Sequence, residues 1–195
     1  MRTRTFMFFG PSGSGKGTQA KLLIDFLENK QGRKVIYIET GQKIREFIIN
    51  GGYTSRLTKE IIDKGGLLPA FLPVWLWTSH LNENFTGEED LVLDGLCRRP
   101  YEAPVLDSAL KFYKLDKPFV VSLNVSRDWS MERLKSRGRK DDTEEYINSR
   151  LDWYEKEVAP SVDFFRNNPD YNLLEINGEQ PIEKVYEEII QKSGI

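Results

Sequence analysis

The sequence has a single cysteine, Cys97, and a single histidine, His80, among its 195 residues. One cysteine excludes an internal disulfide, and one residue of each kind is too few for a cysteine–histidine zinc site. The histidine lies in a segment rich in tryptophan and leucine, which favours a packing role. No apolar run approaches the roughly 20 residues that span a membrane, and the first residues show no signal-peptide pattern. We therefore expect a cytoplasmic protein with no membrane partner.

An excess of charge of either sign is also lacking, because the formal net charge is only −2. This balance does not favour non-specific binding to nucleic acid, so we expect no nucleic-acid partner. Hydrophobic residues make up 39% and charged residues 30% of the chain, which are proportions of a globular protein. The length suits one α/β domain with small insertions, and we interpret residues 1–195 as a single domain.

A glycine-rich segment near the start of the chain has the pattern of a phosphate-binding loop. Residues 10–18 fit G-x-x-x-x-G-K with a hydroxyl residue close behind, between the apolar run Thr5–Phe9 and a helical pattern over Thr18–Asn29. The glycines let backbone N–H groups converge on phosphate oxygens, and the helix start adds partial positive charge. Lys16 can follow a transferring phosphoryl group, and Thr18 can place an oxygen near Mg²⁺. A glycine-rich turn without a ligand is the alternative, which the lysine and the flanking elements disfavour.

Apolar runs alternate with helical patterns along the rest of the chain. Strands are predicted at Thr5–Phe9, Val35–Glu39, Leu91–Leu93, Phe119–Asn124 and Leu173–Ile176. Helices are predicted at Thr18–Asn29, Ala103–Tyr113, Trp129–Arg137, Thr143–Asn167 and Pro181–Lys192. Continuous apolar strands between helices indicate a parallel sheet covered on both faces. The sequence therefore predicts a three-layer α/β/α fold with a five-stranded parallel sheet.

Two segments interrupt this alternation. Residues 41–84 carry helical patterns with no strand between them, and the glycine pairs at 51–52 and 65–66 punctuate the segment. We interpret it as a small helical insertion that is mobile at these glycines. Residues 136–142 form a short basic turn between two helices. Asp142 is predicted to N-cap the second helix, with Glu145 completing a capping box.

Polar and basic residues follow the predicted strands where a phosphate-binding site would be expected. Residues 40–45 read Thr-Gly-Gln-Lys-Ile-Arg after the second strand, and residues 94–98 read Asp-Gly-Leu-Cys-Arg after the third. In a parallel sheet both segments lie at the carboxyl edge, beside the phosphate loop. Four arginines surround the basic turn: Arg133, Arg137, Arg139 and Arg150.

The order of these motifs resembles that of adenylate kinases along nearly the whole chain. The phosphate loop with Gly17 after the lysine, the Thr-Gly-x-x-x-Arg at 40–45 and the Leu-Asp-Gly-Leu-Cys-Arg at 93–98 are each similar to a motif of that family. Residues 133–151 are similar to its lid and the helix that follows. The resemblance implies a P-loop kinase fold with an NMP-binding insertion at 41–84 and a very short lid at 136–142. It also implies a monomer that uses Mg²⁺ as cofactor and ATP and AMP as substrates.

The resemblance further implies roles for individual residues. ATP would be bound by Gly13, Ser14, Gly15, Lys16, Gly17, Thr18, Arg133 and Gly178. AMP would be bound by Thr40, Gly41, Arg45, Gly95, Arg98 and Glu102. The catalytic residues would be Lys16, Arg98, Arg137, Arg139 and Arg150. Mg²⁺ would be held by Asp94, through water, and by Thr18. Guanidinium groups suit these roles because they meet phosphate oxygens two at a time.

Two departures from the family pattern concern the metal and the backbone. Gln42 stands where the family usually has aspartate, which leaves Asp94 more isolated, so we expect weaker metal dependence or slower turnover. Cys97 replaces a proline whose preceding peptide is often cis in that family. Because a cis bond before a non-proline residue costs about 2.5–4 kcal/mol, we expect the Leu96–Cys97 peptide to be trans.

A third departure concerns the acceptor base. Glu102 stands where the family has a glutamine that reads adenine. Glutamine can donate to adenine N1 and accept from the 6-amino group, whereas an ionised carboxylate only accepts. Guanine offers N1–H and its 2-amino group as two donors, so GMP is an alternative acceptor, unless Glu102 turns away to pair with Arg99. The resemblance along the whole chain favours AMP.

Two other functions are open to a chain with these motifs. A small-molecule kinase that acts on a sugar or acid is disfavoured, because a neutral hydroxyl acceptor does not need the two phosphate forks of Arg45 and Arg98. A nucleotide-binding regulatory protein without turnover is suggested only by Gln42 and Glu102. The retained lysine, aspartate and arginines favour an enzyme, because a passive binder has little use for transfer-site charge.

Overall fold

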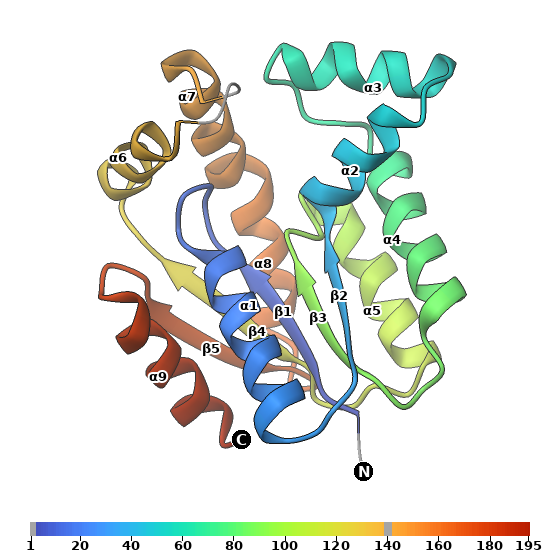
Figure 1. Ribbon diagram of the computed structural model, residues 1–195, viewed down its shortest axis with the longest axis vertical. Helices are drawn as coiled ribbons and strands as arrows, with labels where there is room; N and C mark the ends of the chain where they lie inside the picture. The colour runs from blue at the N-terminus through green and yellow to red at the C-terminus, as the bar shows by residue number, and fades with distance from the viewer. Residues whose placement is uncertain (1–2, 139–141) are drawn as a thin grey trace.

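One parallel sheet forms the centre of the molecule (Figure 1). The computed structural model describes residues 3–138 and 142–195. The strands are β1 (Thr5–Phe9), β2 (Val35–Glu39), β3 (Asp90–Asp94), β4 (Phe119–Asn124) and β5 (Asn172–Asn177), in the order β2-β3-β1-β4-β5. All pairings between neighbouring strands of this sheet are parallel. The predicted five-stranded parallel sheet is therefore confirmed.

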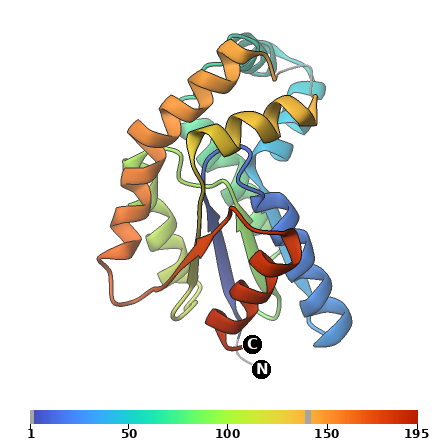
Figure 2. The same cartoon turned by 90° about the vertical axis from the view of Figure 1, so that its left-hand side faces the viewer.

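Helices cover both faces of the sheet and make three layers (Figure 2). On one face lie α1 (Lys16–Asp25) and α9 (Ile182–Ser193), and on the other α4 (Phe71–Asn84), α5 (Ala103–Phe112) and α8 (Ala159–Arg166). Side chains of a strand alternate between its faces, so Phe6 and Phe8 enter the first core while Met7 and Phe9 enter the second. Both cores require apolar residues, which explains why the strands read as continuous hydrophobic runs.

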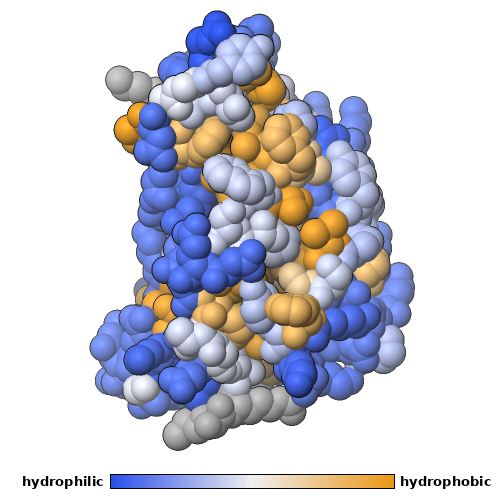
Figure 3. Space-filling view, turned by 90° about the vertical axis from the view of Figure 1, so that its right-hand side faces the viewer, coloured by the Kyte–Doolittle hydropathy of each residue, from blue (hydrophilic) through white to orange (hydrophobic). Residues whose placement is uncertain are grey.

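The segment after β2 forms a helical insertion with a small core of its own. It consists of α2 (Thr40–Ile49), α3 (Tyr53–Asp63) and α4, and its core contains Ile44, Leu68 and Leu72. Figure 3 shows the side of the molecule on which this insertion lies, where apolar patches interrupt the hydrophilic surface. The insertion contributes exposed apolar side chains at Ile49, Tyr53, Phe71 and Trp75.

The second interruption lies between α6 (Arg127–Arg137) and α7 (Glu144–Trp153). Helix α7 continues through a π-helical turn (Tyr154–Val158) into α8, so the helix predicted over 143–167 is correct in extent but contains this irregular turn. The predicted capping box is wrong. Thr143, rather than Asp142, caps α7, because its hydroxyl accepts from the backbone N–H of Tyr146 at 3.4 Å. The Asp142 carboxylate is engaged by arginines instead.

Smaller differences from the predicted elements arise at their ends. Helix α1 begins at Lys16 and passes into a π-helical turn (Phe26–Lys30), and a short 3₁₀ turn (Pro100–Glu102) precedes α5. Strand β3 is longer than predicted because Asp90 and Asp94 continue the ladder opposite Val35 and Glu39 of β2. Polar residues at strand ends do not show in an apolar pattern.

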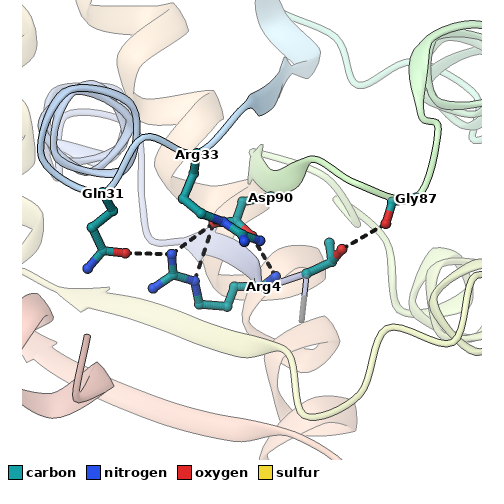
Figure 4. A network of polar contacts seen from close by, with 6 residues as sticks. Arg4, Gln31, Arg33, Gly87 and Asp90 are labelled. Atoms are coloured by element: carbon teal, nitrogen blue, oxygen red, sulfur yellow. Dashed lines mark hydrogen bonds and ion pairs between the residues drawn. The ribbon is translucent and has the colours of Figure 1, made fainter. Parts of the chain in front are cut away.

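A buried carboxylate joins three segments at the amino edge of the sheet (Figure 4). Asp90 is fully buried and accepts from the backbone N–H of Arg4 at 2.8 Å and from its guanidinium group. The guanidinium of Arg33 forms a second ion pair with Asp90, at 2.6 Å. Gln31 accepts from Arg4 at 2.6 Å and completes the network. These bonds connect the start of β3 to the segments that lead into β1 and β2.

None of the helices in the described ranges combines the length and apolar character needed to cross a bilayer.

Candidate active site

The loop between β1 and α1 is shaped by its glycines. Gly13 and Gly15 have φ angles of 87° and 93°, in the left-handed region that favours glycine. A Cβ at Gly13 would also lie 2.8 Å from a backbone oxygen of α6. Lys16 begins α1, and its ammonium group donates to the carbonyl oxygens of Gly10 and Pro11 at 2.8 and 2.9 Å. The lysine is therefore folded back over the loop, at the start of a helix.

An acidic group faces this lysine from the end of β3. Asp94 is 6% exposed, and burial raises its pKa, an effect that Lys16 opposes and Glu39 reinforces. The hydroxyl of Tyr37 donates to Asp94 Oδ2 at 3.3 Å. Burial likewise lowers the pKa of Lys16, while Asp94 raises it. The opposite charges of Lys16 and Asp94 thus partly offset the effect of burial on each other's pKa.

Two guanidinium groups converge near Gly41, just after the end of β2. Arg98 donates from Nε to the Gly95 carbonyl oxygen at 3.2 Å, and Arg45 forms an ion pair with Glu39 at 3.1 Å. A Cβ at Gly41 would lie 3.2 Å from Arg45 Nη1 and 3.8 Å from Arg98 Nη2. Glycine at this position therefore leaves room for two arginine forks to face one another across the end of β2.

The arginines of α6 and α7 form a separate group. Arg137 and Arg150 both donate to Asp142, at 2.8 Å and 2.7 Å from their Nη2 atoms to Oδ1. Arg150 also donates to the Tyr146 carbonyl oxygen. Arg133 lies over the indole ring of Trp129, 4.5 Å from its centroid, which is a cation–π contact.

These groups line one cleft of about 550 Å³ at the carboxyl edge of the sheet. The predicted site residues that it brings together are Gly13, Gly15, Lys16, Gly17, Thr18, Gly41, Arg45, Asp94, Gly95, Arg98, Arg133, Arg137 and Arg150. Arg139 lies outside the described residues. The cleft therefore joins the phosphate loop, the start of the insertion and the helices of the second interruption.

Four predicted residues lie beside the cleft rather than on its wall. Ser14 and Thr40 are buried, and their hydroxyl oxygens have no hydrogen-bond partner within the described part of the chain. Gly178 is buried against Val125, where an added Cβ would lie only 2.5 Å from Cγ1. Glu102 lines a smaller pocket next to the cleft. Packing thus accounts for the glycine at 178 without a ligand.

Asp94 has one neighbouring carboxylate, although Gln42 replaces the aspartate of the family pattern. Glu39 ends β2 directly opposite Asp94 of β3 and lines the same cleft, which supplies a second carboxylate. Gln42 turns its amide toward Glu46, to which it donates at 2.8 Å. No motif contains Glu39, so sequence reasoning missed it. The signal that could have found it is the expected pairing of β2 with β3.

The acidic residues suit a hydrated cation better than a fully caged one. Within residues 3–138 and 142–195, no group of three or more Asp, Glu, His or Cys side chains could hold a metal directly. Mg²⁺ keeps several of its waters and needs only one or two carboxylates. Asp94, Glu39 and the Thr18 hydroxyl face the same cleft and match that donor set.

Two predictions concern the segment after Asp94: the peptide bond before Cys97 and the partner of Glu102. None of the described peptide bonds is cis, so the Leu96–Cys97 peptide is trans as predicted, and Cys97 has a φ of 55°. Glu102 does not pair with Arg99. Its Oε2 accepts from the backbone N–H of Arg98 at 3.0 Å, whereas Arg99 faces Glu157.

Comparison with known proteins gives consistent matches over most of the chain. A family model described as adenylate kinase matches residues 8–169. An adenylate kinase of Corynebacterium urealyticum is 34% identical over 181 residues, which cover 93% of this chain and 94% of the relative. Adenylate kinase 1 of a Nostoc species is 34% identical over 183 residues, covering 94% and 95%. An adenylate kinase of Mycolicibacterium paratuberculosis is 37% identical over 161 residues, covering 83% and 85%.

Proposed function

The chain belongs to the adenylate kinase family, and from this premise we propose how its cleft transfers the γ-phosphoryl group of ATP to AMP, giving two ADP. The activity is that of a phosphotransferase, and the reaction is reversible. The observation that carries the assignment of residues is the convergence of a phosphate loop, two arginine forks and an acidic strand end on one cleft. Each of these parts can bind or neutralise a charged group that takes part in phosphoryl transfer.

The phosphate loop binds the donor in this proposal. Backbone N–H groups from Gly13 to Thr18 surround the phosphates, and the start of α1 adds its partial positive charge. Lys16 exchanges the loop carbonyls for phosphate oxygens, which are stronger acceptors because they are charged. Arg133, already over Trp129, offers a flat cationic surface to the donor base.

The insertion and the segment after β3 bind the acceptor. Arg45 and Arg98 hold the phosphate of AMP, and Gly41 leaves the space between them. Burial lowers the pKa of Arg98, but its ordinary value is so high that the side chain stays charged. Thr40 and Gly95 contribute to the acceptor pocket beside these arginines.

The lid arginines and the acidic groups complete the transfer site. Arg137 and Arg150, with Arg139, neutralise charge on the phosphoryl group during transfer. Thr18 and, through water, Asp94 would hold Mg²⁺, which would supply positive charge to neutralise the phosphates. The acceptor oxygen is already an anion, so positioning and charge neutralisation suffice without a general base.

The test measures nucleoside diphosphate formation from ATP and Mg²⁺ with AMP, GMP, CMP and UMP as acceptors. We expect AMP to be the preferred acceptor. Lys16→Met should lower the rate at least about 100-fold, since it removes a charge that contacts the transferring group. Lys30→Met is the matched control, because this exposed lysine lies outside the cleft at the end of the π-helical turn.

Two results would contradict these assignments. Wild-type activity in Lys16→Met would overturn the role of this lysine. Nucleotide binding without transfer to any acceptor would favour a regulatory protein. The cytoplasmic location and the monomeric state stay predictions from the sequence, as does the domain role of residues 41–84 and 136–142.

A further inference from the structure

A carboxylate of the protein itself lies next to the two acceptor arginines. Oε1 of Glu39 accepts a hydrogen bond from Nη2 of Arg45 at 3.1 Å, and the two side chains form an ion pair. A Cβ at Gly41 would lie near both forks, 3.2 Å from Arg45 Nη1 and 3.8 Å from Arg98 Nη2. The same Cβ would lie 3.5 Å from Glu39 Oε1. A negative oxygen therefore borders the space in which the proposed function puts the phosphate of AMP.

The two forks form no other ion pair in the part of the chain that the structure describes. Arg98 donates from Nε to the Gly95 carbonyl oxygen, and Arg45 has Glu39 as its charged partner. The side chains of Glu39 and Arg45 are 26% and 53% exposed, and both residues line the cleft. An anion that enters the cleft can therefore reach this pair.

The backbone places Glu39 beside Arg45 without giving its carboxylate a second structural role. Glu39 is the last residue of β2, opposite Asp94 of β3, and α2 begins at the next residue. Its side chain does not cap α2. Among the described residues, Arg45 is the only one that donates a hydrogen bond to this carboxylate. Moving the carboxylate away from Arg45 therefore breaks one contact and leaves β2 and α2 intact.

A phosphate group and this carboxylate have opposing demands on the same arginine. The phosphate of a nucleoside monophosphate carries a charge of about −1.5 to −2 at pH 7 and offers three acceptor oxygens, so it can engage both forks. The carboxylate carries a single charge and pairs with one fork. Two anions placed side by side repel each other, which disfavours a state in which both contact Arg45.

We propose that Glu39 is a built-in competitor of the acceptor phosphate. It pairs with Arg45 while the acceptor site is empty, is displaced when the phosphate of AMP binds to both forks, and pairs with Arg45 again when the nucleotide leaves. The affinity for AMP is therefore lower than the two arginines alone would give. This inference rests on the proposed function.

The charge of Glu39 also acts on the donor side of the cleft. It raises the pKa of Lys16 and of Asp94. A change in turnover on removing this charge would therefore mix effects on donor and acceptor. Binding of AMP without ATP and Mg²⁺ isolates the acceptor side.

Titration calorimetry of AMP binding to the whole chain tests the inference. Glu39→Gln keeps the size of the side chain and a hydrogen-bond acceptor but removes the charge. We expect the Kd for AMP to fall about three- to tenfold, because a charged competitor for Arg45 is lost together with its repulsion of the phosphate. Glu60→Gln is the matched control and should keep the wild-type Kd. Glu60 pairs with Arg56 at 3.8 Å on the same insertion but lies outside the cleft.

A double-mutant cycle distinguishes competition for Arg45 from a general effect of charge. In an Arg45→Gln background, AMP binds more weakly, and the gain from Glu39→Gln should be clearly smaller than in the wild type. An equal gain in both backgrounds would show that Glu39 acts on the phosphate through its charge at a distance, which would overturn the inference.

The remaining outcomes separate this inference from the proposed function. Unchanged or weaker AMP binding by Glu39→Gln, at a wild-type circular dichroism spectrum, would mean that Glu39 orients Arg45 for the phosphate instead of competing with it. That result would overturn the inference and leave the proposed function intact. Failure of the wild type to bind AMP at all would overturn the proposed function, and the inference with it.

Discussion

At the scale of single residues, Asp142 sets the position of two arginines in the proposed transfer site. Its carboxylate receives Arg137 through Nε at 2.9 Å and Nη2 at 2.8 Å, and Arg150 at 2.7 Å. We predict that Asp142→Asn lowers kcat about 10–100-fold with little change in the KM for AMP, since displacement of a transfer group by about 1 Å has such an effect. Steady-state kinetics measures it. Asp163→Asn, at an exposed ion pair with Arg166, is the matched control. A higher kcat would mean that Asp142 sequesters the arginines.

The same carboxylate predicts how stability depends on pH. Burial alone would raise the pKa of Asp142, but hydrogen bonds and charge from Arg137 and Arg150 outweigh it and hold the pKa below its usual range. A carboxyl group with a lowered folded-state pKa stabilises the fold above its unfolded-state pKa of about 3.9. This contribution is lost as pH falls through the folded-state value. The difference in free energy of unfolding between wild type and Asp142→Asn should therefore be larger at pH 6 than at pH 3, and should shrink as pH falls below about 3.9. A difference that persists unchanged at pH 3 would refute the linkage.

Asp90 carries a prediction about stability that is separate from catalysis. Replacing Asp90 with asparagine leaves Arg4 and Arg33 without their shared buried counter-charge. We expect a loss of about 3 kcal/mol in the free energy of unfolding, at the low end for a broken buried ion pair because Arg4 is partly exposed. Urea unfolding measures this loss. The network lies at the amino edge of the sheet, so kcat and KM of the folded variant should match the wild type. A drop in kcat at full folding would contradict this separation.

Residue patterns predicted the parts of the candidate site that lie within local motifs. Lys16 follows a loop whose glycines determine its shape, and Asp94 and Arg98 follow a strand end. Glu39 could not be found in this way, because its importance depends on the register between β2 and β3. The same holds for Asp142, whose partners include Arg150 in the next helix.

At the scale of secondary-structure elements, one contact links the insertion to α7. Gly65, in the loop after α3, has a φ of 69°, and a Cβ there would lie 2.9 Å from Cδ1 of the Tyr146 ring. We predict that Gly65→Ala raises the KM for AMP several-fold, since the left-handed backbone costs about 1 kcal/mol and the ring must move. In a Tyr146→Ala background the steric part of this effect should vanish, leaving only the backbone part.

A double-mutant cycle on kcat/KM isolates that coupling. Gly87→Ala is the matched control for positive φ, because a Cβ at Gly87 would contact nothing within 4 Å and the residue lies outside the cleft. Equal effects of Gly65→Ala in both backgrounds would show that insertion and α7 do not act on each other through this contact.

Element types were predictable because apolar strands and amphipathic helices differ in period. Their ends were less so, for physical reasons. The N-cap of α7 is Thr143 rather than the predicted Asp142, because charged arginines compete for the aspartate more strongly than a backbone N–H does. The π-helical turn at Tyr154–Val158 has no local sequence signal of its own, since the pattern on both sides of it is helical.

At the scale of the whole molecule, the three layers form a base that carries the cleft. Two smaller units flank the cleft, namely the insertion and the helix pair α6 and α7, and we call them the two attachments. The sheet and its helices are packed through two extensive cores, whereas the insertion has a small core of its own and α6 and α7 share another around Leu134 and Ile147. Small cores open locally at lower free energy than extensive ones. Ligand binding should therefore change the attachments and leave the base nearly unaffected.

This division predicts both the size and the location of stabilisation by AMP. At 100 times its dissociation constant, a ligand that binds only the folded state adds about 2.7 kcal/mol. For a chain of this size that corresponds to a Tm increase of about 8 °C. Adenosine, which lacks the phosphate held by Arg45 and Arg98, should give little shift at the same concentration. Hydrogen exchange should slow in α2, which contains Arg45, in α3 and in the segment with Arg98 before α5. In α9, amides that exchange by local opening should be unaffected, and only those that exchange by global unfolding should slow. Equal slowing of the locally opening amides in α9 would mean that AMP also suppresses local opening of the base, and that the insertion does not open as a separate unit.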